Sequence, residues 1–229
     1  MAQVASFVTS GMQIFDISRT LSADLPPWPG DVAFRYQVNG RIAEGSSVNV
    51  GSTEMSLHNG THADAKFHFA DDGWTIEQAK LETYFGPAVV VDLSSQYSGA
   101  PQNGRWPQVQ VAHLEDATDD LRATGRLLLK TAVWRDAKIF PDPIPTVAGG
   151  VPKWLQSLGV KLLGLDVPSV DEIDAKQLVN HHAIGAAGIS IVESLDLTAV
   201  SAGRYNFVAL PLKIAGGDGS PLRAILWRD

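Results

Sequence analysis

The chain has 229 residues, of which 45% are hydrophobic and 19% charged, a composition that predicts one compact domain with an apolar core and excludes a disordered chain. Lys and Arg number 18 against 25 Asp and Glu, so the net charge is −7 and no basic face for nucleic acid is expected. There is no cysteine, which excludes disulfides, thiolate nucleophiles and Cys-based metal sites. Any metal ion must therefore be held by imidazole and carboxylate groups.

The hydrophobic pattern predicts strands alternating with short helices, which is typical of an α/β or α+β domain. The strands are expected at residues 47–57, 88–94, 126–134, 160–167 and 189–195. The helices are expected at residues 75–84, 151–159 and 174–188, with Gly159 and Gly188 ending the last two. Residues 94–108 and 141–150 are rich in proline, glycine and polar residues and are expected to be surface loops.

Two of these segments carry more specific predictions. Residues 47–57 alternate polar and apolar side chains, which predicts a strand with one buried face leading into a cluster of histidines. The C-terminal stretch 204–229 predicts two strands around a Gly-Asp-Gly turn, the signature of a hairpin.

The N-terminal residues have no basic segment followed by an apolar core, so they resemble neither a secretory signal nor a transit peptide. The apolar runs are far shorter than the ~20 residues that a membrane-spanning helix needs. We therefore expect a cytoplasmic protein with no membrane partner.

The segment HNGTHADAKFHF, residues 58–69, holds three of the six histidines of the chain. Gly60 lets the backbone turn tightly, so that the imidazoles of His58 and His62 can approach one point, and His62 shares a face with Asp64 if the chain is extended. Two imidazoles and one carboxylate form half of a divalent metal site. The alternative for Asp64 is to orient an imidazole from outside the metal shell.

His68 follows within the same segment, between two phenylalanines. Its imidazole is a candidate fourth ligand, or a base beside the metal. A catalytic metal keeps a coordination position open for water, which favours the second role.

A second cluster, HHAIGAAGISIVE, spans residues 181–193. The predicted helix end and strand can bring Glu193 close to His181 and complete a metal shell, whereas the alternative for Glu193 is a structural ion pair. His181 and His182 point in different directions on a helix, so only one of them can face the metal, and the residues alone do not say which.

Two further residues, Trp28 and His113, carry expectations of their own. Trp28 lies between prolines, which restrict its backbone and can present the indole to an aromatic substrate or to the edge of the core. His113 is expected to have a structural role, as an isolated histidine that bonds to its neighbours.

The segment HNGTHADAKFHF resembles the His-x-Gly-Thr-His-x-Asp-x-x-x-His signature of the cyclase-like metal hydrolases, most closely of their bacterial arylformamidase branch. The resemblance extends from about Ile14 to Leu226, which leaves residues 1–13 as a short N-terminal extension of a single hydrolase domain over residues 1–229. The other similar blocks include FDISRTLSADLPPWPGD, VVVDLS, LLLKT, GVKLLGLDVPSVDEIDAKQL, HHAIGAAGISIVESLDL and GRYNFVALPLKIAGGDGSPLRAIL.

The resemblance implies a swivelling β/β/α fold, a small barrel-like mixed sheet flanked by helices. It implies two divalent metal ions per subunit, most simply Zn²⁺ with Mn²⁺ as an alternative, and a homodimer or higher homo-oligomer. One ion is assigned to His58, His62 and Asp64, and the other to Asp64, His181 and Glu193, with Asp64 bridging. His68 is implied as the proton donor and acceptor, and Trp28 as a contact to a small-molecule substrate.

The reaction implied is hydrolysis of N-formyl-L-kynurenine to L-kynurenine and formate, a step of tryptophan degradation in which the metals activate a water molecule. The wider family also hydrolyses cyclic amides such as isatin, which is the alternative reaction, and a closed structural metal site in a binding module is the non-enzymatic one. The chain departs from many members at Lys66, where they have proline, which bears on substrate preference more than on metal binding.

Overall fold

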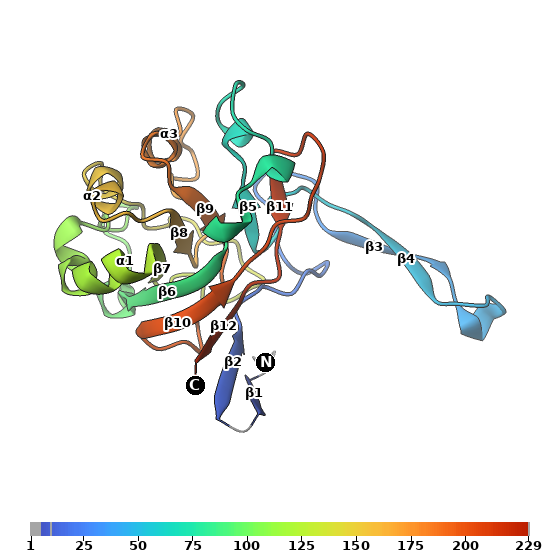
Figure 1. The fold of residues 1–229 in the computed structure, drawn as a ribbon. Helices are drawn as coiled ribbons and strands as arrows, with labels where there is room; N and C mark the ends of the chain where they lie inside the picture. Colours follow the sequence, from blue (N-terminus) through green and yellow to red (C-terminus); the bar gives the residue numbers. More distant parts are fainter. Residues whose placement is uncertain (1–5, 10, 229) are drawn as a thin grey trace.

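The computed structural model describes residues 6–9 and 11–228, and the side chains from residue 11 onward. It confirms the mixed α/β fold: a ten-stranded sheet curls into a half-barrel, and three short α-helices lie on one side of it (Figure 1). The order across the sheet is β1-β2-β12-β10-β6-β7-β8-β9-β5-β11. In the described part of the chain, no helix is long and apolar enough to cross a membrane.

The elements are short. The strands are β1 (Ser6–Thr9), β2 (Met12–Asp16), β3 (Arg35–Gly40), β4 (Val50–Glu54), β5 (His62–Asp64), β6 (Phe85–Asp92), β7 (Arg126–Lys130), β8 (Leu162–Leu165), β9 (Ser190–Glu193), β10 (Gly203–Val208), β11 (Gly219–Pro221) and β12 (Ile225–Arg228). The α-helices are α1 (Thr118–Thr124), α2 (Val151–Ser157) and α3 (Val179–Ala186).

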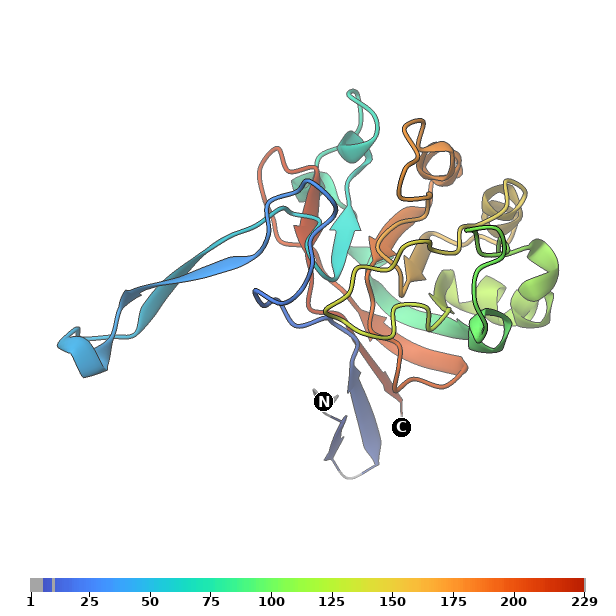
Figure 2. The same ribbon diagram turned by 180° about the vertical axis from the view of Figure 1, so that it is seen from behind.

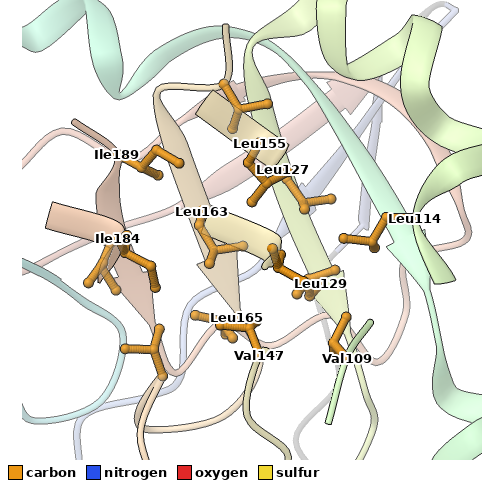
Figure 3. Packing of buried hydrophobic residues seen from close by; sticks show 14 of the residues in the cluster. Val109, Leu114, Leu127, Leu129, Val147, Leu155, Leu163, Leu165, Ile184 and Ile189 are labelled. Carbon is orange, nitrogen blue, oxygen red and sulfur yellow. The ribbon is translucent and has the colours of Figure 1, made fainter. Parts of the chain in front are cut away.

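The centre of the sheet is parallel, from β6 through β7 and β8 to β9, and corresponds to four of the predicted strands. These strands are almost continuously apolar because both faces are covered. Alternate residues face opposite sides of the sheet. Leu127 and Leu129 pack toward the helices with Leu155 and Ile184 (Figure 3). Leu128 belongs to a second buried cluster, with Phe207. The helices thus brace the parallel strands from outside.

The predicted α-helix over residues 75–84 is wrong. Two 3₁₀ turns, Ile76–Gln78 and Leu81–Thr83, occupy this segment. Ala79, with ψ of 133°, is extended and separates them, and the backbone N–H of Ile76 donates to the carbonyl of Gly217 at 2.8 Å instead of serving a helix. Tertiary pairing has replaced local helical bonding here.

The other two predicted helices are present with shifted ends. Helix α2 ends at Ser157, and Gly159 follows its C-cap Leu158 with a left-handed φ of +75°. Helix α3 begins only at Val179, five residues later than predicted, and stops before Gly188, whose φ is +72°. Residues 174–178 are instead a loop beside the pocket described below.

The strand predicted at residues 47–57 exists as β4, but the prediction that it has a buried face is wrong. All residues of β4 are exposed, because β4 pairs only with β3 in a two-stranded arm that projects from the body (Figure 2). Nothing in the described chain covers either face of this arm, which we call the β3–β4 arm. Its exposed apolar side chains include Tyr36, Val38, Ile42, Val48 and Val50.

The predicted C-terminal hairpin is also wrong. Strand β10 pairs with β12, with Asn206 opposite Trp227, but the chain between them makes a long excursion instead of a tight turn. Within that excursion β11 pairs with β5, so that Gly219 lies opposite Asp64. The Gly-Asp-Gly turn therefore lies beside the histidine segment.

Candidate metal centre

Strand pairing aligns the two sequence clusters. The short strand β5 is extended, as the shared face of His62 and Asp64 requires, and lies between β9 and β11. Its antiparallel register with β9 sets His62 directly opposite Glu193. Helix α3, immediately before β9, adds His181 to the same point.

The five side chains proposed as ligands lie together. The Nε2 atom of His62 lies 3.3 Å from Oδ1 of Asp64 and 3.4 Å from Oε2 of Glu193. The Nε2 atom of His181 lies 3.5 Å from Oδ2 of Asp64 and 3.7 Å from Oε1 of Glu193. The Nδ1 atom of His58 lies 3.1 Å from Oδ1 of Asp64. Asp64 thus faces all three imidazoles, the central position that a bridging ligand needs.

The outer nitrogen of each imidazole has a separate hydrogen-bond acceptor. His62 Nδ1 donates to the carbonyl of Gly60 at 2.9 Å, which places its proton on that side of the ring. His181 Nδ1 contacts Oδ2 of Asp171 at 2.7 Å, and His58 Nε2 contacts Oδ2 of Asp218 at 2.9 Å. This is how metal-binding histidines are oriented in proteins.

The inner atoms therefore need a cation. When Nδ1 of His62 and of His181 carries the proton, Nε2 of each ring has a lone pair that faces buried carboxylate oxygens. The lone pair and the carboxylates repel each other unless a proton or a metal ion lies between them. Oδ2 of Asp64 is buried and has no hydrogen-bond partner among the described residues. Imidazole and carboxylate are the donors that Zn²⁺ and Mn²⁺ accept, so the residues present fit a divalent metal.

Gly60 makes the approach of the first two histidines feasible. Its φ of +63° is left-handed, and a Cβ there would lie 3.0 Å from Leu21 and 3.1 Å from Leu25. Glycine is the residue that adopts this turn without strain or clash.

The carboxylates shift the pKa of each imidazole. Burial by itself lowers these values, but hydrogen bonds to Asp218 and Asp64 raise the pKa of His58 to about 8. Hydrogen bonds to Asp64 and Glu193 raise the pKa of His62 to about 10, against the same effect of burial. The pKa of His181 is likewise raised to about 10, chiefly by hydrogen bonds to Asp171 and Asp64. Without metal, the three imidazoles hold protons at neutral pH.

We therefore expect metal affinity to rise with pH across the neutral range, because each imidazole must release a proton to bind metal. The same protonation affects the stability of the metal-free protein. Protonated His58 and His62 stabilise the metal-free fold fully below the unfolded pKa of about 6.5, and this stabilisation is lost as pH rises through the folded values of about 8 for His58 and about 10 for His62. Calorimetric titration with Zn²⁺ in buffers of different ionisation enthalpy measures the released protons. Affinity independent of pH, without proton release, would contradict the prediction.

His68 lies beside the five proposed ligands. Its ring centroid is 4.0 Å from that of His58 and 5.9 Å from that of His181, and its Nδ1 lies 3.6 Å from Oδ2 of Asp218. Burial lowers its pKa, so that the ring is neutral at pH 7. The geometry allows both roles considered for it, because ligand atoms of His58, Asp64 and His68 also lie within 4.8 Å of one another.

A cavity of about 530 Å³ opens above the centre. Its base includes His58, His62, His68, His181 and Glu193. Its aromatic wall consists of Trp28, Phe140 and Trp134, in which the rings of Trp28 and Phe140 meet edge to face at 5.8 Å. The guanidinium of Arg19 lies 3.8 Å over the ring of Trp134 and braces this wall from behind. Exposed Asp174 and Lys176, two positions apart, line the cavity from the loop before α3.

The remaining sequence candidates lie elsewhere. His182 is exposed, its ring centroid lies 5.8 Å from that of Phe69, and it is absent from the lining of the cavity. His113 accepts a hydrogen bond from the backbone N–H of Gln110 at 3.1 Å, the structural role predicted for it. Lys66 borders a separate small cavity with Asp64 and Phe69, and is absent from the lining of the large one.

Sequence reasoning missed Asp171, Asp218, Phe140 and Trp134. Asp171 closely follows the buried strand β8, at its carboxyl end, which was an unused signal for a functional carboxylate. Asp218 was assigned to a hairpin turn, so its role at the centre was hidden by the wrong pairing.

Fold and site together define an α/β protein with a buried histidine–carboxylate centre under a cavity of small-molecule size. Residues 15–172 match the family described as "Putative cyclase". The chain belongs to this cyclase family.

The chain is also similar to curated relatives and, in its fold, to solved structures. The chain is 41% identical to the "Kynurenine formamidase" of Geobacillus thermodenitrificans (strain NG80-2) over 211 residues, 92% of this chain and 95% of that protein. It is 40% identical to the protein of the same name from Bacillus thuringiensis (strain Al Hakam), with the same coverage. The fold is similar to that of an isatin hydrolase bound to thioisatinate, with a TM-score of 0.81 and 18% identity over 95% of this chain and 93% of that one.

Proposed function

We propose that the chain is a metal-dependent hydrolase of arylformamides, which converts N-formyl-L-kynurenine into L-kynurenine and formate. One observation carries the proposal: proteins named kynurenine formamidase match it over 92% of its length at about 40% identity. The convergence of His62, Asp64, His181 and Glu193 under one cavity supports it, since a metal centre activates water for amide hydrolysis without a protein nucleophile.

We assign one divalent ion to His58, His62 and Asp64, and a second to Asp64, His181 and Glu193, with Zn²⁺ as the first choice and Mn²⁺ as the second. When bound, such ions lower the pKa of water and polarise a carbonyl oxygen. The central position of Asp64, within 3.1–3.5 Å of all three imidazoles, supports its role as the shared ligand.

His68 is proposed to move the proton. Its lowered pKa keeps the imidazole neutral at pH 7, so that it can accept a proton from water and then donate it to the anilide nitrogen. The nitrogen is a poor leaving group until it is protonated. The side chain lines the cavity and is partly exposed, which gives it access to a substrate that occupies the cavity.

The cavity suits the rest of this substrate. Trp28 and its neighbours Phe140 and Trp134 offer an aromatic wall for the aryl ring. Asp174 and Lys176 offer opposite charges to the ammonium and carboxylate groups of the amino-acid tail. Isatin has no charged tail, so this loop favours formylkynurenine over the cyclic amide.

Replacing Lys176 by methionine is therefore expected to raise KM for N-formyl-L-kynurenine about 3- to 10-fold, which corresponds to an exposed charged contact. The KM for N-formylaniline, which has no amino-acid tail, should stay unchanged because the lost charge has nothing to bind. Lys153, exposed on α2 and not part of the cavity lining, provides the matched control substitution. Equal changes in KM for both substrates would contradict tail recognition.

The proposal is tested by loading the purified protein with Zn²⁺ or Mn²⁺, measuring metal content, and following formate release. We expect turnover of N-formyl-L-kynurenine to exceed that of isatin, to be lost on chelation and to return with metal. Faster turnover of isatin would favour the cyclic-amide alternative. A metal-loaded protein that hydrolyses neither substrate would favour a non-enzymatic metal-binding module.

We also propose that the whole chain, residues 1–229, forms one hydrolase domain, since strands from both ends of the described chain share a single sheet. A cytoplasmic location is proposed because tryptophan degradation is an intracellular process, and cell fractionation tests it.

A homodimer is proposed as the functional assembly. The β3–β4 arm supports this, because a two-stranded ribbon with exposed Tyr36 and Ile42 (63% and 59%) is only marginally stable without a covering surface. We expect light scattering to give twice the chain mass, and charged substitutions at Tyr36 and Val38 to shift it toward the monomer. A wild-type protein that stays monomeric at high concentration would contradict this.

A further inference from the structure

The turn Gly217–Asp218–Gly219 contributes a carboxylate to two histidines with different proposed roles. The Oδ2 atom of Asp218 lies 2.9 Å from Nε2 of His58 and 3.6 Å from Nδ1 of His68. The two imidazole rings lie side by side, with centroids 4.0 Å apart. A single oxygen thus lies next to a proposed ligand and the proposed proton carrier.

The turn is held firmly against the centre. The carbonyl of Asp218 accepts a hydrogen bond from the backbone N–H of Ala65 at 2.9 Å, and Gly219 pairs with Asp64 across the β5–β11 ladder. On the other side, the carbonyl of Gly217 accepts from Ile76 at 2.8 Å. The carboxylate therefore extends from a backbone that is fixed at both ends.

The glycine after Asp218 permits this contact. A Cβ at Gly219 would lie 2.8 Å from Cε1 of His58 and 3.0 Å from the carbonyl oxygen of Ala63. Any side chain there would displace the imidazole or the strand, so the backbone of the turn is packed directly on the ring of His58.

We propose that Asp218 is a positioning residue that couples His58 to His68. By accepting the Nε2 proton of His58 it fixes the tautomer whose Nδ1 lone pair faces Asp64 and the metal. Through the same oxygen it holds the ring of His68 beside the centre, in the orientation that proton transfer needs. The part that concerns His68 rests on the proposed hydrolase function, whereas the part that concerns His58 does not.

Asp171 is the natural comparison. Its Oδ2 atom contacts Nδ1 of His181 at 2.7 Å and so orients a proposed ligand in the same way. Among the described residues Asp171 makes no ion pair with His68, whose ion-pair partner is Asp218. Both carboxylates thus orient a proposed metal ligand. Of these two, Asp218 alone also contacts His68.

The experiment compares Asp218→Asn with Asp171→Asn in the metal-loaded enzyme. Each variant should weaken metal binding about 10- to 100-fold in a titration without substrate. At saturating metal, kcat should fall about 10-fold or more only in Asp218→Asn, with little change in KM, because His68 loses its partner. Asp171→Asn should then recover nearly the kcat of the wild type.

Unchanged metal affinity in Asp218→Asn would overturn the assignment to His58, and equal kcat in the two variants at saturating metal would overturn the coupling to His68. The side chain of Asp218 is 42% exposed, so the variant should fold. If the wild type hydrolyses no arylformamide, the proposed function fails, while the metal titration stands. The orientation of the His68 ring in crystals of both variants then tests the coupling, and an unmoved ring in Asp218→Asn overturns it.

Discussion

Replacement of His68 by alanine is expected to lower kcat for N-formyl-L-kynurenine by about 10²–10⁴, or about 3–5 kcal/mol in activation free energy, without loss of bound metal. The imidazole stands beside the proposed ligands, its pKa is lowered by burial, and it lines the cavity. Its removal takes away the group that protonates the anilide nitrogen. The ligand set of His58, His62, Asp64, His181 and Glu193 is left complete.

Metal content and turnover measured side by side for His68→Ala and His62→Ala test this prediction. His62 is fully buried between two carboxylates, so His62→Ala should lose both metal and activity. If His68→Ala loses metal to the same extent, His68 is a ligand and not the proton carrier. The ligand atoms of His58, Asp64 and His68 lie close enough together for His68 to be a metal ligand, and measuring the metal content of the variant distinguishes the two roles. In the active enzyme, turnover should also fall, but only at a pH below the ordinary imidazole value of 6.5, because burial lowers the pKa of His68 and a protonated His68 cannot accept a proton.

Replacement of Asp64 by asparagine is expected to abolish binding of both ions and to reduce hydrolysis to the level of the metal-free protein. Asp64 places one oxygen toward His58 and His62 and the other toward His181. An amide keeps the shape but removes the negative charge between three imidazoles, so neither ion keeps a complete set of donors.

Metal analysis after dialysis, together with the formate assay, measures this effect. Asp92→Asn is a suitable control, because Asp92 pairs with Lys130 at 3.0 Å and lies on β6, which β7, β8 and β9 separate from β5 in the sheet. Retention of one ion with partial activity would show that Asp64 serves a single metal, and the bridging role would then be wrong.

Local sequence patterns predicted the parts of the molecule that depend on short-range physics. The apolar runs of β6, β7, β8 and β9 predicted buried strands, because burial on both faces leaves few polar positions. The spacing of His62 and Asp64 predicted a common face, which an extended chain provides. The pairing of His181 with the site depended on the family resemblance, since its neighbour His182 has the same chemistry.

The wrong predictions concern features that depend on contacts between segments distant in the sequence. The alternation in residues 47–57 predicted a buried face, but alternation reports only that two faces differ, and the β3–β4 arm has no second layer to cover either. The Gly-Asp-Gly turn looked like a local hairpin, whereas β11 pairs with β5, more than 150 positions away in the chain. The same error concealed Asp218, whose role arises only from that distant pairing.

The placement of ligands on hydrogen-bonded strands constrains how such a site can change. The ladder that sets His62 across from Glu193 has a two-residue period, so a slip of β5 by one position would turn His62 and Asp64 to the opposite face and bring Ala63 to the centre. Single insertions or deletions within β5 or β9 are thus intolerable, while substitutions in the loop before α3 leave the alignment intact. We accordingly expect new substrate preferences in this fold to arise by substitutions in the loops that line the cavity, while the proposed metal ligands on β5 and β9 stay unchanged because the strand pairing fixes their positions.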